Sequence, residues 1–300
     1  MISKTAMITI CGRPNVGKST LTNRLVGEKV AIVSNKPQTT RRRISAVAER
    51  DGTQFVFLDT PGFHKPRTKL GDYMVGVVRQ SVAEVDAVLL LAEPAANIGP
   101  QERELIASIR AAGVPAVLAI NKLDTVEPAS LLEVIALYAD AYPFEAIVPI
   151  SARTGEGVDE LFTELGKFAV ESEPLFPEGT VTDQPERQVM AELLREKLLL
   201  CLEREVPHGT AVEITKFSER DNAAGEPVID CEATIYCEKT THKGIIIGKG
   251  GAMLKKIGAL ARHDMEEFMG THVNLQTWVK VRENWRDSDS LLRNFGFSDK

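Results

Sequence analysis

Nearly continuous apolar runs alternate with amphipathic segments along the first half of the chain. The runs that predict strands are Thr5–Cys11, Val85–Leu91, Val114–Ile120 and Ile147–Ile150. Such runs are typical of strands that helices cover on both faces of a sheet. Helical patterns lie between and after them, near Gly17–Val26, Pro100–Ala112, Pro128–Ala141 and Val158–Val170. This alternation predicts an α/β fold with a mostly parallel, doubly wound sheet.

One pair of strands departs from the alternation. Ile44–Arg50 and Thr53–Asp59 both show a strand pattern, and Asp51-Gly52 joins them. Asp-Gly between two strand patterns is a strong signal for a tight hairpin. We therefore expect one antiparallel edge strand in the sheet.

The pattern changes after residue 170. Residues 171–186, with the sequence ESEPLFPEGTVTDQPE, hold three prolines, five acidic residues and no basic ones, which predicts a linker. The order expected beyond it is helix 187–204, strands 210–217 and 228–238, a short helix, a glycine loop, helix 252–269 and strand 272–281. We therefore expect one domain over residues 1–170 and a small α+β domain with a C-terminal tail over residues 187–300.

Composition and charge are those of a globular chain. Of the 300 residues, 43% are hydrophobic and 26% are charged, which suffices for two cores without disulfides or metals. The net charge of −6 does not favour binding to polyanions, although the local charge decides such binding. The four cysteines show no metal-binding spacing. No signal peptide is apparent, and no apolar run approaches the roughly 20 residues of a membrane span, so we expect a cytoplasmic protein.

A phosphate-binding motif follows the first predicted strand. Gly12–Ser19, with the sequence GRPNVGKS, satisfies the pattern GxxxxGK[ST] and opens a predicted helix. Its glycines let backbone N–H groups turn toward phosphates, and the helix N-terminus adds its positive end. Lys18 is expected to bridge the β- and γ-phosphates, and the Ser19 hydroxyl to bind Mg²⁺. The nucleotide-binding candidates are Gly12, Asn15, Val16, Gly17, Lys18, Ser19 and Thr20; the alternative is an ordinary glycine turn.

A second motif selects the base. Asn121-Lys122-Leu123-Asp124 stands as NKxD at the end of a predicted strand. The Asp124 carboxylate can accept hydrogen bonds from guanine N1–H and its 2-amino group, whereas adenine lacks this pair of donors. Asn121 and Lys122 would support the loop and the base face, and Ser151-Ala152-Arg153 would complete base recognition. The motif predicts GTP and GDP as ligands; for these four residues alone, a surface turn is the alternative.

Two further segments match the switch regions of GTPases. Asp59-Thr60-Pro61-Gly62 is DxxG at a strand end, where Asp59 would hold Mg²⁺ through water and the Gly62 N–H would contact the γ-phosphate. Thr39-Thr40 lies between the first helix and the hairpin, where a threonine closes onto Mg²⁺ in the triphosphate state. The alternatives are a strand-end aspartate with a turn and a plain polar loop.

These motifs together carry a resemblance to a known family. GRPNVGKST, PQTTRRR, DTPGF, NKLD and SARTGEGVDEL resemble the Era branch of the translation-factor-related GTPases. In that branch the last threonine before the arginine is the magnesium ligand, which implies Thr40 rather than Thr39. The catalytic candidates are then Lys18, Thr40, Asp59 and Gly62, and the candidate metal ligands are Ser19, Thr40 and Asp59.

The resemblance also bears on hydrolysis. A hydrophobic residue, here Phe63, stands where Ras-like enzymes have the glutamine that positions the attacking water, so slow intrinsic hydrolysis is expected. His64 could act as a base, but a solvated loop histidine is the favoured interpretation. Relatives of this kind often recruit K⁺ through the P-loop asparagine, here Asn15; the alternative is an asparagine that only caps the loop.

A glycine loop of a different kind follows in the second domain. Ile245–Gly251 places Gly248-Lys249-Gly250-Gly251 after an aliphatic run, and residues 239–263 hold six Lys or Arg and no acidic residue. Such a GxxG loop is typical of KH modules, which clamp about four nucleotides of single-stranded RNA. The expected element order matches the type II KH arrangement. The RNA-binding candidates are Ile247, Gly248, Lys249, Gly250, Gly251, Lys255 and Lys256; the alternative is a helix N-terminal turn with a solvated lysine face.

The resemblance covers essentially the whole chain and implies a biological role. It implies RNA near the 3′ end of 16S rRNA, the small (30S) ribosomal subunit and its assembly, no DNA partner, a monomer, and peripheral membrane contact as a family trait. GTP would favour the RNA-competent state by ordering the loops around Thr40 and Gly62. We expect Trp278 and Trp285 to pack in the core rather than stack on bases. The alternatives are a GTPase of RNA processing or modification, and an RNA-binding module whose nucleotide pocket is only structural.

Overall fold

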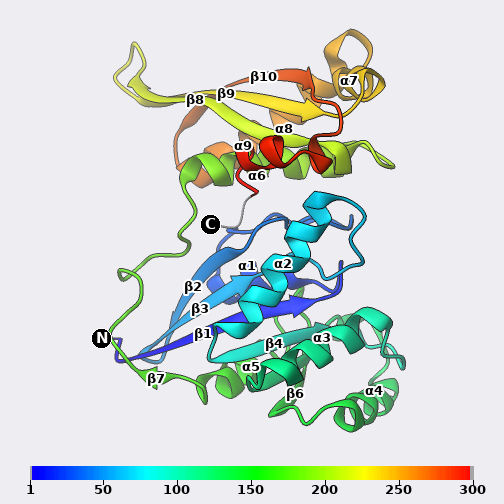
Figure 1. Cartoon of the computed structure of the whole chain (residues 1–300). Coiled ribbons are helices and arrows are strands. Elements are labelled where there is room, and N and C mark those ends of the chain that lie inside the picture. Colours follow the sequence, from blue (N-terminus) through cyan, green and yellow to red (C-terminus); the bar gives the residue numbers. More distant parts are fainter. Residues whose placement is uncertain (1, 298–300) are drawn as a thin grey trace. The chain divides into compact units, whose positions relative to one another are not determined.

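The computed structural model describes residues 2–297, which divide into two compact units (Figure 1). The first unit holds the chain up to Ala31, Thr40–Arg67 and Gly71–Asp183; the second holds Ile32–Thr39, Thr68–Leu70 and the chain from Gln184 onward. Two short segments from the first half of the sequence therefore belong to the second unit. The expected outer domain bounds, residues 1 and 300, lie outside the described residues.

The first unit is built on a seven-stranded sheet with the order β2-β3-β1-β4-β5-β6, and β7 pairs with β1. The parallel strands are β1 (Lys4–Gly12), β3 (Thr53–Asp59), β4 (Ala87–Ala92), β5 (Ala116–Ile120) and β6 (Ala146–Pro149). The hairpin strand β2 (Ile44–Arg50) lies antiparallel to β3 at the edge, as expected. β7 (Val170–Glu171) is antiparallel to β1, so the helix predicted to reach Val170 ends earlier than expected.

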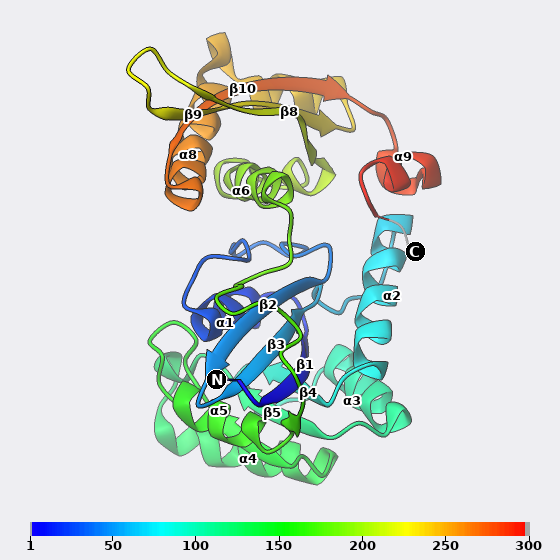
Figure 2. The ribbon, with the colours of Figure 1, turned by 90° about the vertical axis from the view of Figure 1, so that its left-hand side faces the viewer.

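Helices cover both faces of this sheet. α1 (Lys18–Val26) and α5 (Val158–Gly166) pack into the core on one face. α2 (Lys69–Ala83), α3 (Pro100–Ala112) and α4 (Pro128–Ala141) pack into a second core on the other face. In Figure 2, α1 and α5 lie to the left of the sheet, and α2 and α3 lie to its right. The expected doubly wound α/β fold is confirmed.

The sequence predicted no element where α2 lies. Its buried side chains recur every four residues, as in a helix with one covered face: Leu70, Met74, Val78 and Val82. Gly71 and Gly76 lie beside this stripe, and each lowers helix propensity by about 1 kcal/mol. Burial of Val78 and Val82 in the core on this face of the sheet outweighs that cost.

The acidic segment 171–186 is held on the first unit's sheet for much of its length. The Gln54 side chain of β3 accepts hydrogen bonds from the backbone N–H groups of Leu175 and Phe176, both at 2.9 Å. Further along, the Thr182 hydroxyl donates to the Ser45 carbonyl of β2 at 2.8 Å. These contacts fix the chain before the next helix begins at Glu186.

The second unit contains a three-stranded sheet with the order β10-β9-β8. β8 (Ala211–Asp221) and β9 (Pro227–Cys237) are antiparallel, and β10 (His272–Val281) is parallel to β9. α6 (Glu186–Cys201), α7 (Thr240–Ile247) and α8 (Ala252–Met269) share one hydrophobic core with this sheet. The observed order of elements confirms the type II KH fold.

The two tryptophans differ in their surroundings. Trp285, between β10 and α9 (Asp289–Asn294), is fully buried, and its Nε1–H donates to the Gly209 carbonyl at 2.9 Å. Trp278 in β10 is 53% exposed, so the expectation of core packing is wrong for it. The reason is its register, because its strand neighbour Val279 faces the core and side chains alternate along a strand. Within residues 2–297, no helix combines the length and apolar character needed to cross a membrane.

Candidate nucleotide and RNA sites

The nucleotide motifs meet at one edge of the first unit's sheet. The P-loop follows β1, DxxG follows β3, NKxD follows β5, and the Ser151-Ala152-Arg153 segment follows β6. Adjacent parallel strands end at the same edge, which is where open α/β sheets bind ligands. The fold therefore assembles the predicted site residues into one place.

The P-loop glycines are required by close contacts. Gly17 has a φ of 101°, and a Cβ added there would lie 2.2 Å from the Asn121 side-chain nitrogen. A Cβ on Gly12 would lie 2.6 Å from the Leu91 carbonyl oxygen. Only glycine fits either position. The loop leads into α1, whose first backbone N–H groups have no partner within the helix and favour an anion.

Lys18 is a buried cation at the start of α1. Its Nζ donates to the carbonyls of Gly12 at 3.1 Å and Arg13 at 3.0 Å, and the residue is 6% exposed. Burial lowers the pKa of Lys18 to about 8, although Asp59 works in the opposite direction. An anionic phosphate beside Nζ would favour its charged form, as the predicted role of Lys18 requires.

The three candidate metal ligands lie together. The Ser19 and Thr40 hydroxyl oxygens are 2.8 Å apart, and the Asp59 Oδ2 lies 3.0 Å from Ser19 and 3.5 Å from Thr40. Asp59 is fully buried, and its Oδ1 has no hydrogen-bond partner among the described residues. Burial raises the pKa of Asp59 to about 6, while Lys18 and the two hydroxyls lower it.

This cluster fits Mg²⁺. Its donors are two hydroxyls and a carboxylate, the hard oxygen ligands that Mg²⁺ prefers. A buried carboxylate oxygen without a hydrogen-bond partner costs free energy, and a cation in contact with that oxygen would offset the cost.

The DxxG turn packs directly on the P-loop. A Cβ added to Gly62 would lie 2.8 Å from the Pro14 Cα, and the Phe63 N–H donates to the Gly12 carbonyl at 3.1 Å. The Phe63 side chain is 2% exposed and belongs to the core that α2 covers. It therefore points into the protein and cannot orient a water. His64 is half-buried, and its Nδ1 lies 2.8 Å from the Gly62 carbonyl oxygen.

Asn121 ties three motifs together. Its side-chain amide donates to the Val16 carbonyl at 2.7 Å and accepts from the Ala152 N–H at 2.9 Å. The P-loop, NKxD and the Ser151-Ala152-Arg153 segment are thereby locked to one another. Asn121 is 2% exposed, and both of these contacts join loops of the protein.

Asp124 is prepared to accept hydrogen bonds. The Ser151 hydroxyl donates to its Oδ1 at 2.6 Å, and Arg153 forms an ion pair with its Oδ2. The Ser151 hydrogen bond, together with Arg153, holds the pKa of this carboxyl below its usual range. Arg153 is 76% exposed, so its pair is weak and a base can displace it.

Two residues in this region were missed by the sequence interpretation. Glu93 forms ion pairs with Arg13 of the P-loop and with Lys122 of NKxD. It directly follows β4, and this strand-end position was the signal that could have found it. Arg24 of α1 donates to the Ala152 carbonyl at 3.2 Å, a contact that has no local signal because 128 positions separate the partners.

The candidate RNA loop lies between α7 and α8. Gly248, Gly250 and Gly251 have φ values of 73°, 59° and 81°, which favour glycine. A Cβ added to Gly248 would lie 2.7 Å from the Met253 Cβ. Glycine at these positions therefore leaves the loop backbone without side chains that would keep an RNA backbone at a distance.

Exposed cations and apolar side chains flank this loop. Lys249, Lys255 and Lys256 are exposed, and no ion pair involves them in the part of the chain that the structure describes. Ile245 of α7 is 50% exposed and Leu260 of α8 is 41% exposed. Ile247 is half-buried. Unpaired cations beside exposed apolar groups suit phosphates and unstacked bases.

The fold and both sites define the class of protein. Residues 7–122 match the family model described as "50S ribosome-binding GTPase", and residues 205–286 match that of the KH domain. The chain is a P-loop GTPase that carries a C-terminal KH domain.

Full-length relatives place it more closely. The chain is 48% identical to GTPase Era of Alkaliphilus metalliredigens over 297 residues, covering 99% of this chain and 100% of the relative. It is 47% identical to GTPase Era of Clostridioides difficile, covering 99% of each chain. The chain belongs to the GTPase Era family.

Two solved structures resemble the whole chain. One is Era in complex with MgGDPNP and nucleotides 1506–1542 of 16S ribosomal RNA, with a TM-score of 0.94, 38% identity and coverage of 99% of this chain and 100% of the other. The second is a tyrosine-to-alanine variant of Aquifex aeolicus Era bound to GDP·AlF₄⁻, with a TM-score of 0.93, 37% identity and the same coverage.

Proposed function

We propose that this chain binds GTP with Mg²⁺ and hydrolyses GTP to GDP and phosphate at the predicted site residues. The observation that carries this proposal is the buried cluster of Ser19, Thr40 and Asp59 beside Lys18. The solved relatives with MgGDPNP and with GDP·AlF₄⁻, a mimic of the transferring phosphoryl group, support it.

Each residue has a defined task. Backbone N–H groups of Gly12–Ser19 grip the phosphates, and the Lys18 ammonium balances charge on the β- and γ-phosphates. Ser19 and Thr40 would hold Mg²⁺ directly and Asp59 through water; when bound, the ion neutralises charge that develops on the phosphate oxygens. The Gly62 N–H fixes the γ-phosphate, so that a water attacks in line.

Hydrolysis without a partner should be slow. Phe63 is turned into the core and stands where Ras-like enzymes have the glutamine that orients the water. Asn15, exposed and with a φ of 66°, is the candidate for holding K⁺. That role stays a prediction, and turnover measured in sodium and in potassium tests it, since equal rates would contradict it.

We further propose that the KH domain binds single-stranded RNA near the 3′ end of 16S rRNA and that the protein serves small-subunit assembly. The relative solved with nucleotides 1506–1542 supports this target. The contacts would come from the backbone of Gly248–Gly251, from Ile247 and from the exposed Lys249, Lys255 and Lys256. We also propose a cytoplasmic monomer; peripheral membrane contact stays a prediction taken from the family alone.

A paired assay tests this function. Purified protein should convert GTP to GDP, and Lys18→Ala should abolish turnover while leaving the binding of a 3′-terminal 16S fragment to the nucleotide-free protein intact. Lys255→Ala with Lys256→Ala should do the reverse, because each lysine contributes phosphate contacts to RNA binding. If wild-type protein fails to hydrolyse GTP, or binds an unrelated RNA equally well, the proposed function is wrong.

A further inference from the structure

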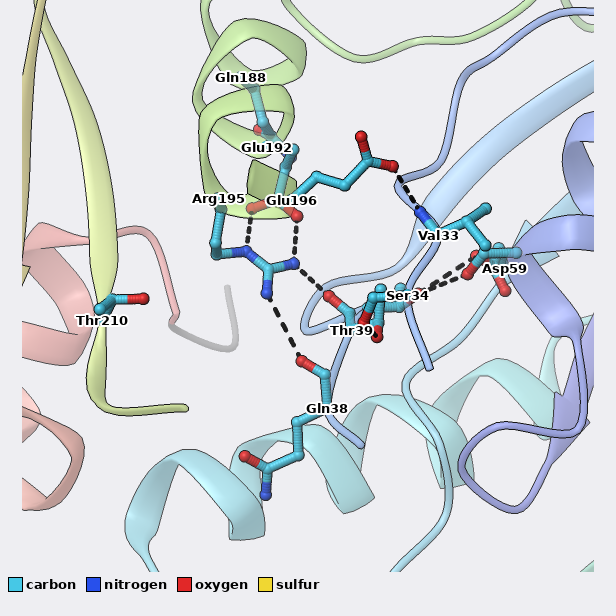
Figure 3. A network of polar contacts seen from close by, with 12 residues as sticks. Val33, Ser34, Gln38, Thr39, Asp59, Gln188, Glu192, Arg195, Glu196 and Thr210 are labelled. Carbon is cyan, nitrogen blue, oxygen red and sulfur yellow. Dashed lines mark hydrogen bonds and ion pairs between the residues drawn. The ribbon is translucent and has the colours of Figure 1, made fainter. Parts of the chain in front are cut away.

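The loop that leads to Thr40 is held by a helix of the KH domain. Ile32–Thr39 belongs to the same compact unit as α6, and its contacts with α6 lie within that unit. Figure 3 shows them, with Arg195 between Glu192 and the carbonyls of Gln38 and Thr39. The predicted switch segment thus ends at a residue that α6 grips.

Arg195 is the centre of this contact. It is 2% exposed, and its Nε donates to the Glu192 carboxylate at 2.9 Å. Its Nη2 donates both to the Glu192 carboxylate and to the Thr39 carbonyl, and its Nη1 donates to the Gln38 carbonyl at 3.5 Å. A planar guanidinium that is anchored on one edge presents its remaining N–H groups in a fixed direction. Lysine could not reproduce this geometry.

The backbone at this point needs such a partner. Gln38 has a φ of 62°, a left-handed conformation that is disfavoured for a residue with a Cβ. Residues held in such conformations persist where surrounding contacts determine them. The hydrogen bonds that Arg195 donates to the Gln38 and Thr39 carbonyls are such contacts.

Two further contacts fasten the segment upstream. The Glu196 carboxylate accepts from the Val33 N–H at 2.9 Å. Lys36 Nζ donates to the carbonyls of Leu199 and Leu202 at the C-terminal end of α6, where a cation is favoured. The whole stretch from Val33 to Thr39 is therefore attached to one helix.

We propose that Arg195 is a positioning residue for the GTPase reaction, which sets the Thr40 hydroxyl by holding the two carbonyls before it. Thr40 follows directly, and its hydroxyl lies 2.8 Å from that of Ser19. α6 thereby supplies part of the nucleotide switch. The inference rests on the proposed magnesium role of Thr40.

The test separates positioning from mere folding. GDP has no γ-phosphate and does not need Thr40 to close, whereas GDPNP with Mg²⁺ does. Arg195→Ala should weaken GDPNP affinity about tenfold, the factor that loss of one charge-assisted hydrogen bond corresponds to. GDP affinity should stay within about twofold, and half-maximal GTP turnover should need more Mg²⁺. Arg195→Lys should behave like Arg195→Ala.

Arg187→Ala is the matched control. Arg187 is an exposed residue of the same helix and donates to the Phe217 carbonyl, away from the loop. It should leave both affinities and the Mg²⁺ dependence unchanged.

Unchanged GDPNP affinity and Mg²⁺ dependence in Arg195→Ala would overturn the inference. So would an equal loss of GDP and GDPNP affinity in both Arg195 variants, because that pattern means a structural role. Wild-type protein that did not hydrolyse GTP would instead contradict the proposed function, so the two failures are distinguishable.

Discussion

In the proposed site, one carboxylate is expected to select the base. Asp124 accepts a 2.6 Å hydrogen bond from Ser151 and should offer its oxygens to guanine N1–H and the 2-amino group. In Asp124→Asn an amide donor replaces one acceptor, so guanine loses a partner. Xanthine, which has a carbonyl at C2, gains one. We expect GTP affinity to fall by at least about 100-fold and xanthosine triphosphate to bind better than GTP, as calorimetric titration would show.

Arg153→Ala is the control for this change. Arg153 pairs with the same carboxylate but is largely exposed, so its removal should alter GTP affinity little. Because the pKa of Asp124 lies below its usual range, the carboxylate stays ionised and the guanine preference should persist from about pH 7 to about pH 5. If Asp124→Asn lost affinity for GTP and for xanthosine triphosphate equally, this role of Asp124 would be contradicted.

Gly17 permits a second test at this scale. In Gly17→Ala the new Cβ would lie 2.2 Å from the Asn121 amide, at a φ of 101°. The P-loop or Asn121 must then shift, and we expect GTP and GDP affinity both to fall by about 100-fold or more. Gly27→Ala is the control, because Gly27 also has a positive φ of 85° but its Cβ would meet nothing within 4 Å. If the two variants bound nucleotide equally, the close contact would not matter.

The site residues that the sequence predicts differ from those it does not predict in how far along the chain their partners lie. Lys18, Asp59 and Asp124 were found because each stands at a fixed offset from a strand end or a glycine loop. Arg24 and Arg195 were not found, because their carbonyl partners lie 128 and 156 positions away in the sequence. Only packing brings such pairs together, and an arginine in a helical pattern gives no sign of a distant partner.

At the scale of elements, the ion pairs of α6 connect it to α8. Lys197 Nζ contacts Glu196 at 2.8 Å and Asp264 of α8 at 2.5 Å, and Lys197 and Glu196 are both buried. Burial works to lower the pKa of Lys197, but its hydrogen bonds to Asp264 and Glu196 outweigh burial and raise it. The ammonium therefore stays charged at neutral pH, and its stabilising contribution is lost only as pH rises above the usual lysine range.

Removing this cation should destabilise the KH domain. Lys197→Met leaves the buried Glu196 and the half-buried Asp264 without their shared partner, and such a loss costs about 3–5 kcal/mol. The unfolding midpoint of the KH domain in urea should fall accordingly, as followed by the fluorescence of Trp285. Lys216→Met is the control, because Lys216 pairs with Glu232 at 3.7 Å on an exposed strand and should cost about 0–1 kcal/mol. Equal midpoints for the two variants would show that the buried group adds nothing.

Elements were predicted well where pattern and burial agree. The apolar strands of both sheets and the helix 252–269 lie where the sequence placed them, because their periodicity continues without a break. α2 was missed because Gly71 and Gly76 lower its helix propensity, and Trp278 was misplaced because composition does not say which face of β10 is covered. Both errors concern tertiary burial, which overrides local propensity.

At the scale of the whole molecule, one helix serves two chemistries. α6 grips the segment that ends at Thr39, and through Lys197 it is paired with Asp264 of α8, the helix that begins after the GxxG loop. Closure of Thr40 with the triphosphate and binding of RNA at the loop therefore both act on elements attached to α6. If closure of Thr40 tightens RNA binding, RNA must tighten binding of the triphosphate by the same factor, by linkage.

This argument predicts a measurable coupling. A fragment equivalent to the 1506–1542 segment bound by the solved relative should bind more tightly with GDPNP than with GDP, by about 5- to 150-fold, and should raise GDPNP affinity by the same factor. Arg195→Ala should reduce this ratio toward one, because it releases the loop from α6. Lys255→Ala should instead weaken RNA binding in both nucleotide states and leave the ratio intact, since a phosphate contact does not involve the switch. RNA affinity that is the same with either nucleotide in wild-type protein would contradict this coupling.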